Sequence, residues 1–162
     1  MRKEKGVSLL ELLVVITIFA ALALISTRGI FLTLRGSRKS DALSMVRGNL
    51  DFSMAIMERQ LRNAESVNCA LPTQVLYEDK NGESTFFSCE DIGGANDGNV
   101  SSNSARLTSS KVDVTDCEFI CDPGTAKVPP SVSISITAQD AVATGVEGAN
   151  VTLNTKIFLR TY

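Results

Sequence analysis

Histidine is absent from the 162-residue sequence. Nucleophilic catalysis by a Ser–His or Cys–His pair requires an imidazole as its base. Zinc sites in proteins rely on histidine or on a dense cluster of thiolates. The absence therefore excludes these enzyme classes and most zinc sites. We expect the chain to be no enzyme, with no catalytic residue and no metal ligand.

An excess of positive charge is absent as well, since the formal net charge is -2 and the sequence pI is ≈ 5.2. This balance argues against a protein that coats nucleic acid. No aromatic platform for base stacking accompanies the basic residues after the first apolar run, which are Arg28, Arg35, Arg38, Lys39 and Arg47. We expect no nucleic-acid partner and a solvating role for these side chains.

Ionisable side chains are nearly missing between Val7 and Ile25, where Glu11 is the only one. An apolar run of about 18 residues or more is long enough to cross a bilayer as a helix. A carboxylate inside such a run must be paired, neutralised or brought to a polar surface. The sequence therefore predicts a membrane-spanning helix over residues 7–27, with Glu11 as a functional residue.

The residues around Glu11 carry a recognisable pattern. A basic leader, Met1 to Lys5, precedes Gly6, the apolar Val7, a serine, two leucines and Glu11. This order resembles the class III signal of type IV pilins and type II secretion pseudopilins, although Val7 stands where that family most often has phenylalanine. The resemblance implies a leader peptide over residues 1–6, cleavage after Gly6 by a prepilin peptidase, and N-methylation of Val7.

The same resemblance implies assembly into a filament with other pilin or pseudopilin subunits at an inner-membrane assembly platform. Glu11 lies one helical turn from the amine that cleavage would create on Val7, and the resemblance favours docking of Glu11 against the amine of a neighbouring subunit. Basic residues flank both ends of the apolar run, so their count does not set the orientation. The resemblance places the N-terminus in the cytoplasm, one helix in the cytoplasmic membrane and the head outside the cytoplasm, in the filament after assembly.

A secretory signal peptide or a plain membrane anchor is the alternative for this segment. The apolar run is longer than the core of a typical signal peptide, and no Ala-x-Ala-like cleavage site follows it. A simple anchor gains nothing from a buried glutamate. The pattern therefore favours the pilin-like interpretation.

An amphipathic continuation of the helix is predicted over residues 28–66, because no proline occurs before Pro72. A helix from Ser8 to Ala64 would be roughly 85 Å long at 1.5 Å per residue. Its apolar stripe has steps of three and four and comprises Leu43, Val46, Leu50, Met54, Met57, Leu61 and Ala64. Residues 58–64 resemble the helix end of J-type pseudopilins and related minor pilins, with a Glu-Arg-x-Leu-Arg-x-Ala pattern.

Residues 67–162 are predicted to form one small β-rich head, which makes the chain α+β, with the long helix packed on a small antiparallel sheet. Residues 75–77 and 84–88 flank Asn81-Gly82 as a hairpin, and residues 90–104 read as a loop. Short strands are expected at 106–108, 112–115 and 118–120, with breaks at Pro123-Gly124 and Pro129-Pro130. The alternating runs 132–137 and 151–159 are expected to pair antiparallel across a turn at 145–148.

Four cysteines, Cys69, Cys89, Cys117 and Cys121, lie in the segment that is predicted to be outside the cytoplasm, where disulfides persist. Cys117 and Cys121 would be roughly 13 Å apart in one extended strand, too far for a bond. We favour Cys69 with Cys89, and Cys117 with Cys121 if the chain turns at residues 120–123. A zinc site is the alternative, which one Cys-x3-Cys spacing supports weakly.

The loop at residues 90–99 offers Asp and Asn oxygens on a glycine-rich backbone, which are ligands for calcium. Its spacing matches no EF-hand, and solvated turns have the same composition. We therefore expect no cofactor, with calcium in this loop as the alternative.

Two functions remain open for the whole chain. One is a structural, minor subunit of a type IV pilus-like filament or a type II secretion pseudopilus, near the tip or in assembly initiation. The other is a membrane-anchored extracytoplasmic module that binds a ligand and does not polymerise. Gly6 and Glu11 discriminate between them, because only the first function needs both residues.

Overall fold

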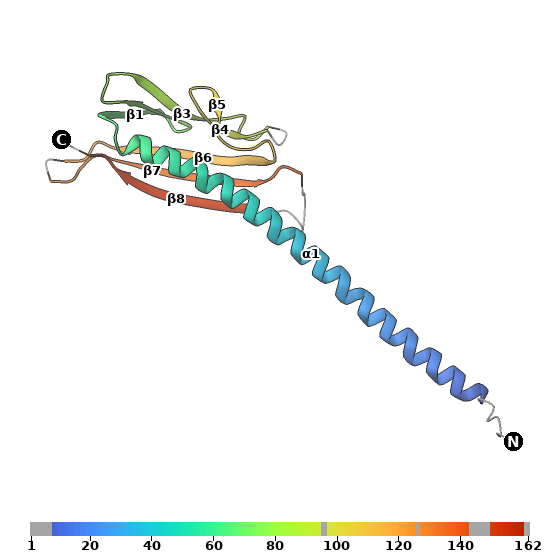
Figure 1. Cartoon of the computed structure of the whole chain (residues 1–162). Helices are drawn as coiled ribbons and strands as arrows, with labels where there is room; N and C mark the ends of the chain where they lie inside the picture. Colours follow the sequence, from blue (N-terminus) through green and yellow to red (C-terminus); the bar gives the residue numbers. More distant parts are fainter. Residues whose placement is uncertain (1–7, 95–96, 126, 143–149, 161–162) are drawn as a thin grey trace. The chain divides into compact units, whose positions relative to one another are not determined.

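A long helix and two antiparallel sheets make up the computed structural model, which describes residues 8–94, 97–125, 127–142 and 150–160 (Figure 1). The α+β class is therefore confirmed. Gly6, Val7 and the expected turn at 145–148 lie outside the described residues. The chain divides into two compact units, Met1–Arg38 and Lys39–Tyr162.

Helix α1 spans Leu9–Leu61 and runs through Gly29, Gly36 and Gly48 without interruption. It ends three residues before the predicted Ala64. There the amides of Asn63 and Ala64 donate to carbonyls three residues back, which tightens the last turn.

The buried face of α1 lies in the second unit and comprises Ala42, Val46, Leu50, Ser53, Met54, Met57 and Leu61. It belongs to one hydrophobic core shared with both sheets. The expected stripe is correct except at its start, where Leu43 is 38% exposed and Ala42 is buried instead. Ala42 lies four residues before Val46, in the row that continues to Leu50, whereas Leu43 is rotated away from that row.

The first sheet has the order β1-β2-β3-β4-β5, and its strands are β1 Ser66–Leu71, β2 Gln74–Glu78, β3 Ser84–Glu90, β4 Asn99–Ser102 and β5 Ala105–Arg106. The predicted hairpin is confirmed, because β2 pairs with β3 and Gly82 has φ +79 in the turn between them. The prediction of an uninterrupted loop over residues 90–104 is wrong. Strand β4 forms within it because Val100 is fully buried opposite Cys89, although its neighbours are polar.

The second sheet has the order β6-β7-β8, and its strands are β6 Val112–Asp122, β7 Ser131–Asp140 and β8 Asn150–Phe158. The antiparallel pairing of β7 with β8 is confirmed. The two short strands predicted at 112–115 and 118–120 are one strand, with a bulge between Val114 and Asp116. A bulge places one extra residue in a strand and bends it without ending the ladder.

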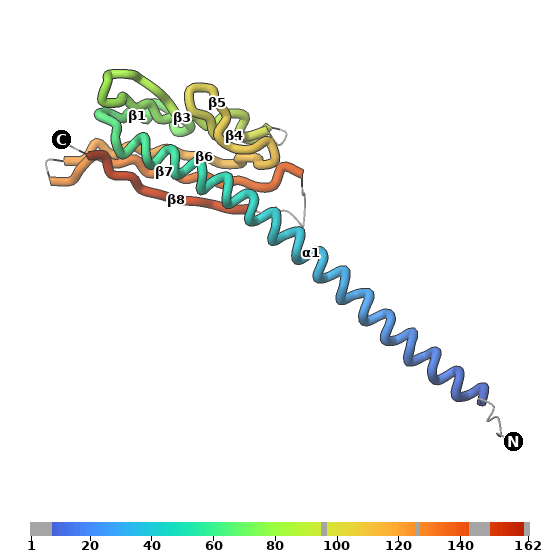
Figure 2. Tube along the Cα trace, viewed as in Figure 1, coloured from blue at the N-terminus to red at the C-terminus, as the bar shows by residue number. Residues whose placement is uncertain are grey.

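Strand β6 connects the two sheets. It contacts β1, β2 and β4 on one side and pairs with β7 on the other (Figure 2). The Phe119 amide donates to Pro72 O at 2.7 Å, and the Val114 amide donates to Gly98 O at 2.8 Å. These bonds join β6 to the connections at two points of the first sheet.

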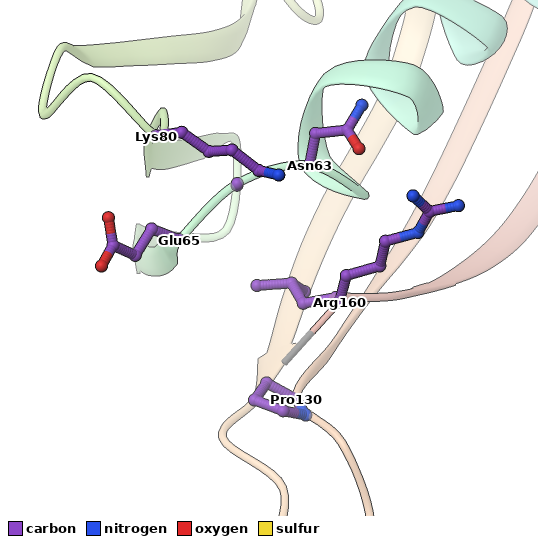
Figure 3. A pocket seen from close by; sticks show the side chains of 7 residues that line it. Asn63, Glu65, Lys80, Pro130 and Arg160 are labelled. Carbon is purple, nitrogen blue, oxygen red and sulfur yellow. The ribbon is translucent and has the colours of Figure 1, made fainter. Parts of the chain in front are cut away.

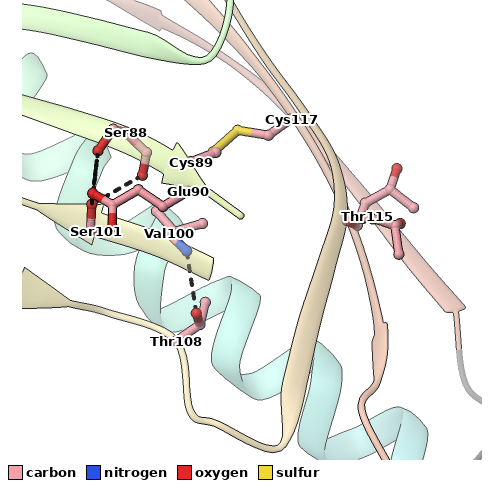
Figure 4. The surroundings of a disulfide bond; sticks show 9 residues. Ser88, Cys89, Glu90, Val100, Ser101, Thr108, Thr115 and Cys117 are labelled. Atoms are coloured by element: carbon pink, nitrogen blue, oxygen red, sulfur yellow. Dashed lines mark hydrogen bonds between the residues drawn. A yellow bond between two sulfur atoms is a disulfide. The ribbon is translucent and has the colours of Figure 1, made fainter. Parts of the chain in front are cut away.

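Both disulfides reinforce this junction, because each joins the first sheet to β6. Cys69 of β1 bonds Cys121, and Cys89 of β3 bonds Cys117 (Figure 4). The favoured pairing of Cys69 with Cys89 and Cys117 with Cys121 is therefore wrong. The turn that it required is missing, since β6 stays extended through Asp122. Cys117 and Cys121 point to the same side of this strand, toward the first sheet.

Candidate processing and assembly site

The beginning of α1 positions the predicted docking residue. Ser8 precedes the helix, and its carbonyl accepts the Leu12 amide at 3.1 Å, which makes Ser8 the cap residue. Glu11 follows three residues later, in the first turn. A negative side chain in this turn is favourable because the free amides of a helix start carry partial positive charge.

Ser8 and Glu11 also have the Ser-x-x-Glu spacing of a capping box, in which the acid sits three residues after the cap. In the signal pattern, Ser8 is one of the residues between Gly6 and Glu11 and has no role of its own. The Ser-x-x-Glu spacing is the signal in the sequence that could have predicted the capping role of Ser8. Glu11 thus stands where it can stabilise the start of the helix as well as meet another charge.

The surface of α1 from Leu12 to Ile25 is apolar on all sides. Every large apolar side chain between Leu9 and Leu34 is exposed, from 49% at Val14 to 79% at Leu9. Such a surface is far larger than soluble monomers leave open to water. This helix is the one, among the described residues, that is long and apolar enough to cross a membrane.

The threonine hydroxyl groups of this segment are bonded to carbonyl groups of the helix itself. Thr17 Oγ1 donates to Val14 O at 2.8 Å, Thr27 Oγ1 to Ala23 O at 2.7 Å, and Thr33 Oγ1 to Gly29 O at 3.0 Å. A polar group in hydrocarbon must find its partner within the protein. The three threonines therefore do not prevent α1 from entering an apolar environment, and Glu11 remains as the charged exception between Ser8 and Thr27.

The structure describes only some of the residues that were expected to form a site. Gly6 and Val7, the predicted cleavage and methylation positions, lie outside the described residues. All four cysteines are in disulfides, so the zinc alternative has no thiolate available. Within the described ranges, no group of three or more His, Cys, Asp or Glu side chains could hold a metal ion.

Part of the loop that was considered as an alternative calcium site is held in place by strand β4 and by a hydrogen bond to β6. Asn99 is buried at the start of β4, and the Gly98 amide donates to Asp113 Oδ1 at 3.0 Å. These residues are therefore held by the fold rather than presented as free ligands. Residues 95–96 of this loop lie outside the described part of the chain.

A cavity of ≈ 450 Å³ lies in the head at the end of α1, and sequence reasoning did not anticipate it (Figure 3). Its walls come from the end of the helix, the β2–β3 turn and the segments before β7 and after β8. The lining residues are Asn63, Ala64, Glu65, Lys80, Pro130, Leu159 and Arg160. The wall contains charged groups of both signs as well as apolar groups, so its composition does not favour one class of ligand.

Comparison with known proteins gives one match. A family model described as the prokaryotic N-terminal methylation motif matches residues 1–27, which include Glu11 and the beginning of α1. No curated protein and no solved structure matches the chain.

Proposed function

We propose that the chain, whose N-terminal methylation motif supports a type IV pilin-like family, is a structural subunit of a type IV pilus-like filament or a type II secretion pseudopilus. Residues 1–6 are then the leader, 7–27 the membrane and filament-core helix, 28–66 the helix that continues into the head, and 67–162 the head. A prepilin peptidase cleaves after Gly6, and Val7 receives the methyl group.

One observation carries the proposal: the methylation motif extends into a helix whose large apolar side chains are all exposed from Leu9 to Leu34. A filament subunit uses such an apolar helix in two successive environments. As a membrane monomer it is covered by lipid, and after assembly it is covered by the helices of neighbouring subunits. The threonine hydroxyls bonded to their own helix suit both environments.

Glu11 acts as the docking residue in this proposal. Its carboxylate pairs with the methylated amine of Val7 on a neighbouring subunit, which reduces the cost of keeping either charge away from water. Its place in the first helical turn fixes the carboxylate near the end of the apolar surface. The carboxylate can therefore pair with the amine of a neighbouring subunit only at this position along the helix axis.

A minor position, at the tip or in assembly initiation, follows from the Glu-Arg-x-Leu-Arg-x-Ala pattern at residues 58–64. In the structure this pattern forms the end of α1, where Arg62 pairs with Glu58 and the Gln60 side chain accepts a hydrogen bond from the Tyr77 hydroxyl. The pattern therefore joins the helix to the first sheet. The partners in this proposal are the prepilin peptidase, other pilin-like subunits and the inner-membrane assembly platform.

Intact-mass analysis of the protein purified from membranes tests the processing step. The expected mass lacks residues 1–6 and includes one added methyl group. A Gly6→Ala variant should retain more of its leader, since the added Cβ crowds the scissile bond, where glycine leaves the backbone free. Recovery of the wild-type chain with its leader intact would support the membrane-anchored module that does not polymerise.

Incorporation of variants into sheared filaments tests the docking step. Glu11→Gln keeps the size of the side chain and removes its charge, and we expect normal membrane insertion with filament incorporation at least about tenfold lower. Asp41→Asn is the matched control, because Asp41 is an exposed acid of the same helix. Equal incorporation of both variants would remove Glu11 from the docking role.

A further inference from the structure

Strand β8 forms an edge of the second sheet. It pairs with β7 over its whole length, from Asn150 opposite Gln139 to Phe158 opposite Ser131. On its other side, no strand within the described ranges pairs with it. A nine-residue strand therefore has one complete row of backbone groups directed away from its own sheet.

The hydrogen bond just beyond β8 identifies that row. The Leu159 amide donates to Pro130 O at 2.9 Å. Because bonded and non-bonded pairs alternate in an antiparallel ladder, the odd-numbered residues of β8 bond to β7. The outward N–H and C=O groups are therefore those of Asn150, Thr152, Asn154, Lys156 and Phe158.

On the core side of the sheet, burial decreases from β7 to this edge. Ile134, Ile136 and Ala138 of β7 are at most 1% exposed. Their partners in β8, which are Thr155, Leu153 and Val151, are only half-buried. An additional strand beside β8 would cover Val151 and Leu153 in the way that β8 covers its neighbours on β7.

The charge of this edge is a single cation. Lys156 is the only ionisable residue of β8, and its Nζ lies 5.5 Å from the centre of the Phe158 ring. Natural edge strands are protected from pairing by charged side chains, lysine especially, by proline or by a bulge. Strand β8 has no proline and no bulge, so Lys156 is its one protecting charge, which the acidic side chain of a partner would offset.

We propose that the free edge of β8 binds an extended segment of a partner protein by strand addition. The partner segment has alternating apolar and polar residues, with apolar side chains beside Val151 and Leu153 and a carboxylate beside Lys156. Main-chain hydrogen bonds to the even-numbered residues supply affinity, and the alternating side chains and the acid supply selectivity. This interaction goes beyond filament assembly, because it uses the head and not the N-terminal helix.

A second copy of the chain is a poorer occupant of this edge. Two copies that pair through β8 and keep their core faces on one side would run antiparallel. Strand β8 runs in the same direction as the packed half of α1 (Figure 1), so the helices of the two copies would be antiparallel too. The packed halves of the two helices would then enter the joined heads from opposite ends.

Amide hydrogen exchange on the full-length chain in detergent micelles tests the edge directly. In the free protein we expect rapid exchange at Thr152, Asn154 and Lys156, and slow exchange at Leu153 and Thr155. The probe is a synthetic peptide with the sequence of residues 131–140 carrying Ser133→Glu, which alternates as the proposed partner does. Its addition should slow exchange at the three even-numbered residues by at least about tenfold.

Two variants of β8 make the test specific. Asn154→Pro removes one outward amide without touching a bond to β7, and it should weaken peptide binding at least about tenfold. Asn154→Thr keeps the amide and should bind the peptide as the wild type does. Lys156→Glu should weaken binding of this peptide and strengthen binding of the same peptide carrying Ser133→Lys, which gives a second readout if the proline variant does not fold.

Three results would overturn the proposal. Slow exchange at the even-numbered amides of the free monomer would mean that the edge is already covered. Undiminished binding to a folded Asn154→Pro variant would place the peptide elsewhere. Protection that appears with rising protein concentration and without peptide would assign the edge to a second copy. Cleavage after Gly6 affects none of these readouts, so a failure of the proposed function is recognised separately.

Discussion

Gly98 lies so close to β6 that a Cβ atom on it would stand 2.0 Å from the Val114 carbonyl oxygen. The two residues are also bonded, since the Val114 amide donates to Gly98 O. On the same segment, Asp113 accepts the Gly98 amide through one oxygen and the Gln139 amide group through the other. The connection before β4 is therefore held against the second sheet by backbone contacts that only glycine permits.

Replacement of this glycine should destabilise the head. Gly98→Ala forces the backbone apart, and we expect a loss of about 1–3 kcal/mol in the free energy of unfolding, as for other overpacked sites. Gly48→Ala is the control, because a Cβ there meets no atom within 4 Å. In the helix interior it should add about 0.5–1 kcal/mol. Urea unfolding of the full chain in micelles measures both, and equal stabilities would contradict the contact.

The two disulfides should stabilise the head, because each of them joins the first sheet to β6. They close loops with sequence separations of 52 and 28 residues. Removal of either bond, by Cys69→Ser with Cys121→Ser or by Cys89→Ser with Cys117→Ser, should cost about 2–4 kcal/mol of unfolding free energy. Peptide mapping without reduction should recover the two cross-linked pairs. Recovery of a peptide that links Cys69 to Cys89 would contradict the pairing described above.

The two faces of α1 in the head should respond differently to truncation. Leu50 is fully buried, whereas Phe52 is 58% exposed. Leu50→Ala should cost about 2–5 kcal/mol because it leaves a cavity in the core. Phe52→Ala removes a larger side chain and should change stability by less than about 0.5 kcal/mol. Chemical unfolding of both variants decides the matter, and a large loss for Phe52→Ala would mean that this face is packed.

The turn between β2 and β3 should depend on pH through Asp79. Hydrogen bonds from the amides of Glu83 and Asn81, at 3.0 and 2.8 Å, lower the pKa of the Asp79 carboxyl. The folded turn thus favours the charged form. The contribution of these hydrogen bonds to the stability of the turn is fully present above the pKa that Asp79 has in the unfolded chain. It is lost as pH falls through the lower pKa that Asp79 has in the folded turn.

A titration by NMR should follow this turn directly. The midpoint for Asp79 should lie below that of an ordinary aspartate, and the protection of the Glu83 amide should fall in the same pH range. Asp79→Asn should abolish that dependence because it has no proton to gain. A midpoint in the ordinary range would show that the two amides do not hold the carboxylate in solution.

Local patterns in the sequence predicted much of this architecture. The apolar steps of three and four placed Val46, Leu50, Met57 and Leu61 on the buried face of α1. Alternation placed β7 and β8, and Asn81-Gly82 placed the hairpin. Each of these signals depends on residues close together in the chain. The expected processing and docking residues likewise rest on a contiguous motif, which the family model matches at residues 1–27.

Other features were not readable because they depend on distant neighbours. Val100 is buried only because Cys89 and the core lie beside it, so β4 was taken as loop. Strand β6 was divided in two because its bulge interrupts the alternation without ending the strand. Leu43 and Ala42 are both apolar, and only the position of the sheet decides which of them is covered.

The sequence by itself determined an acid in the first turn of an apolar helix, followed by a cysteine-containing β-rich head, because composition and short-range periodicity encode these features. Only the tertiary structure decided that β6 receives both disulfides and that β8 is left with a free edge. The reason is that cysteine pairing and strand order depend on which segments meet in space. Local alternation specifies the face of a strand, but it does not specify its neighbour.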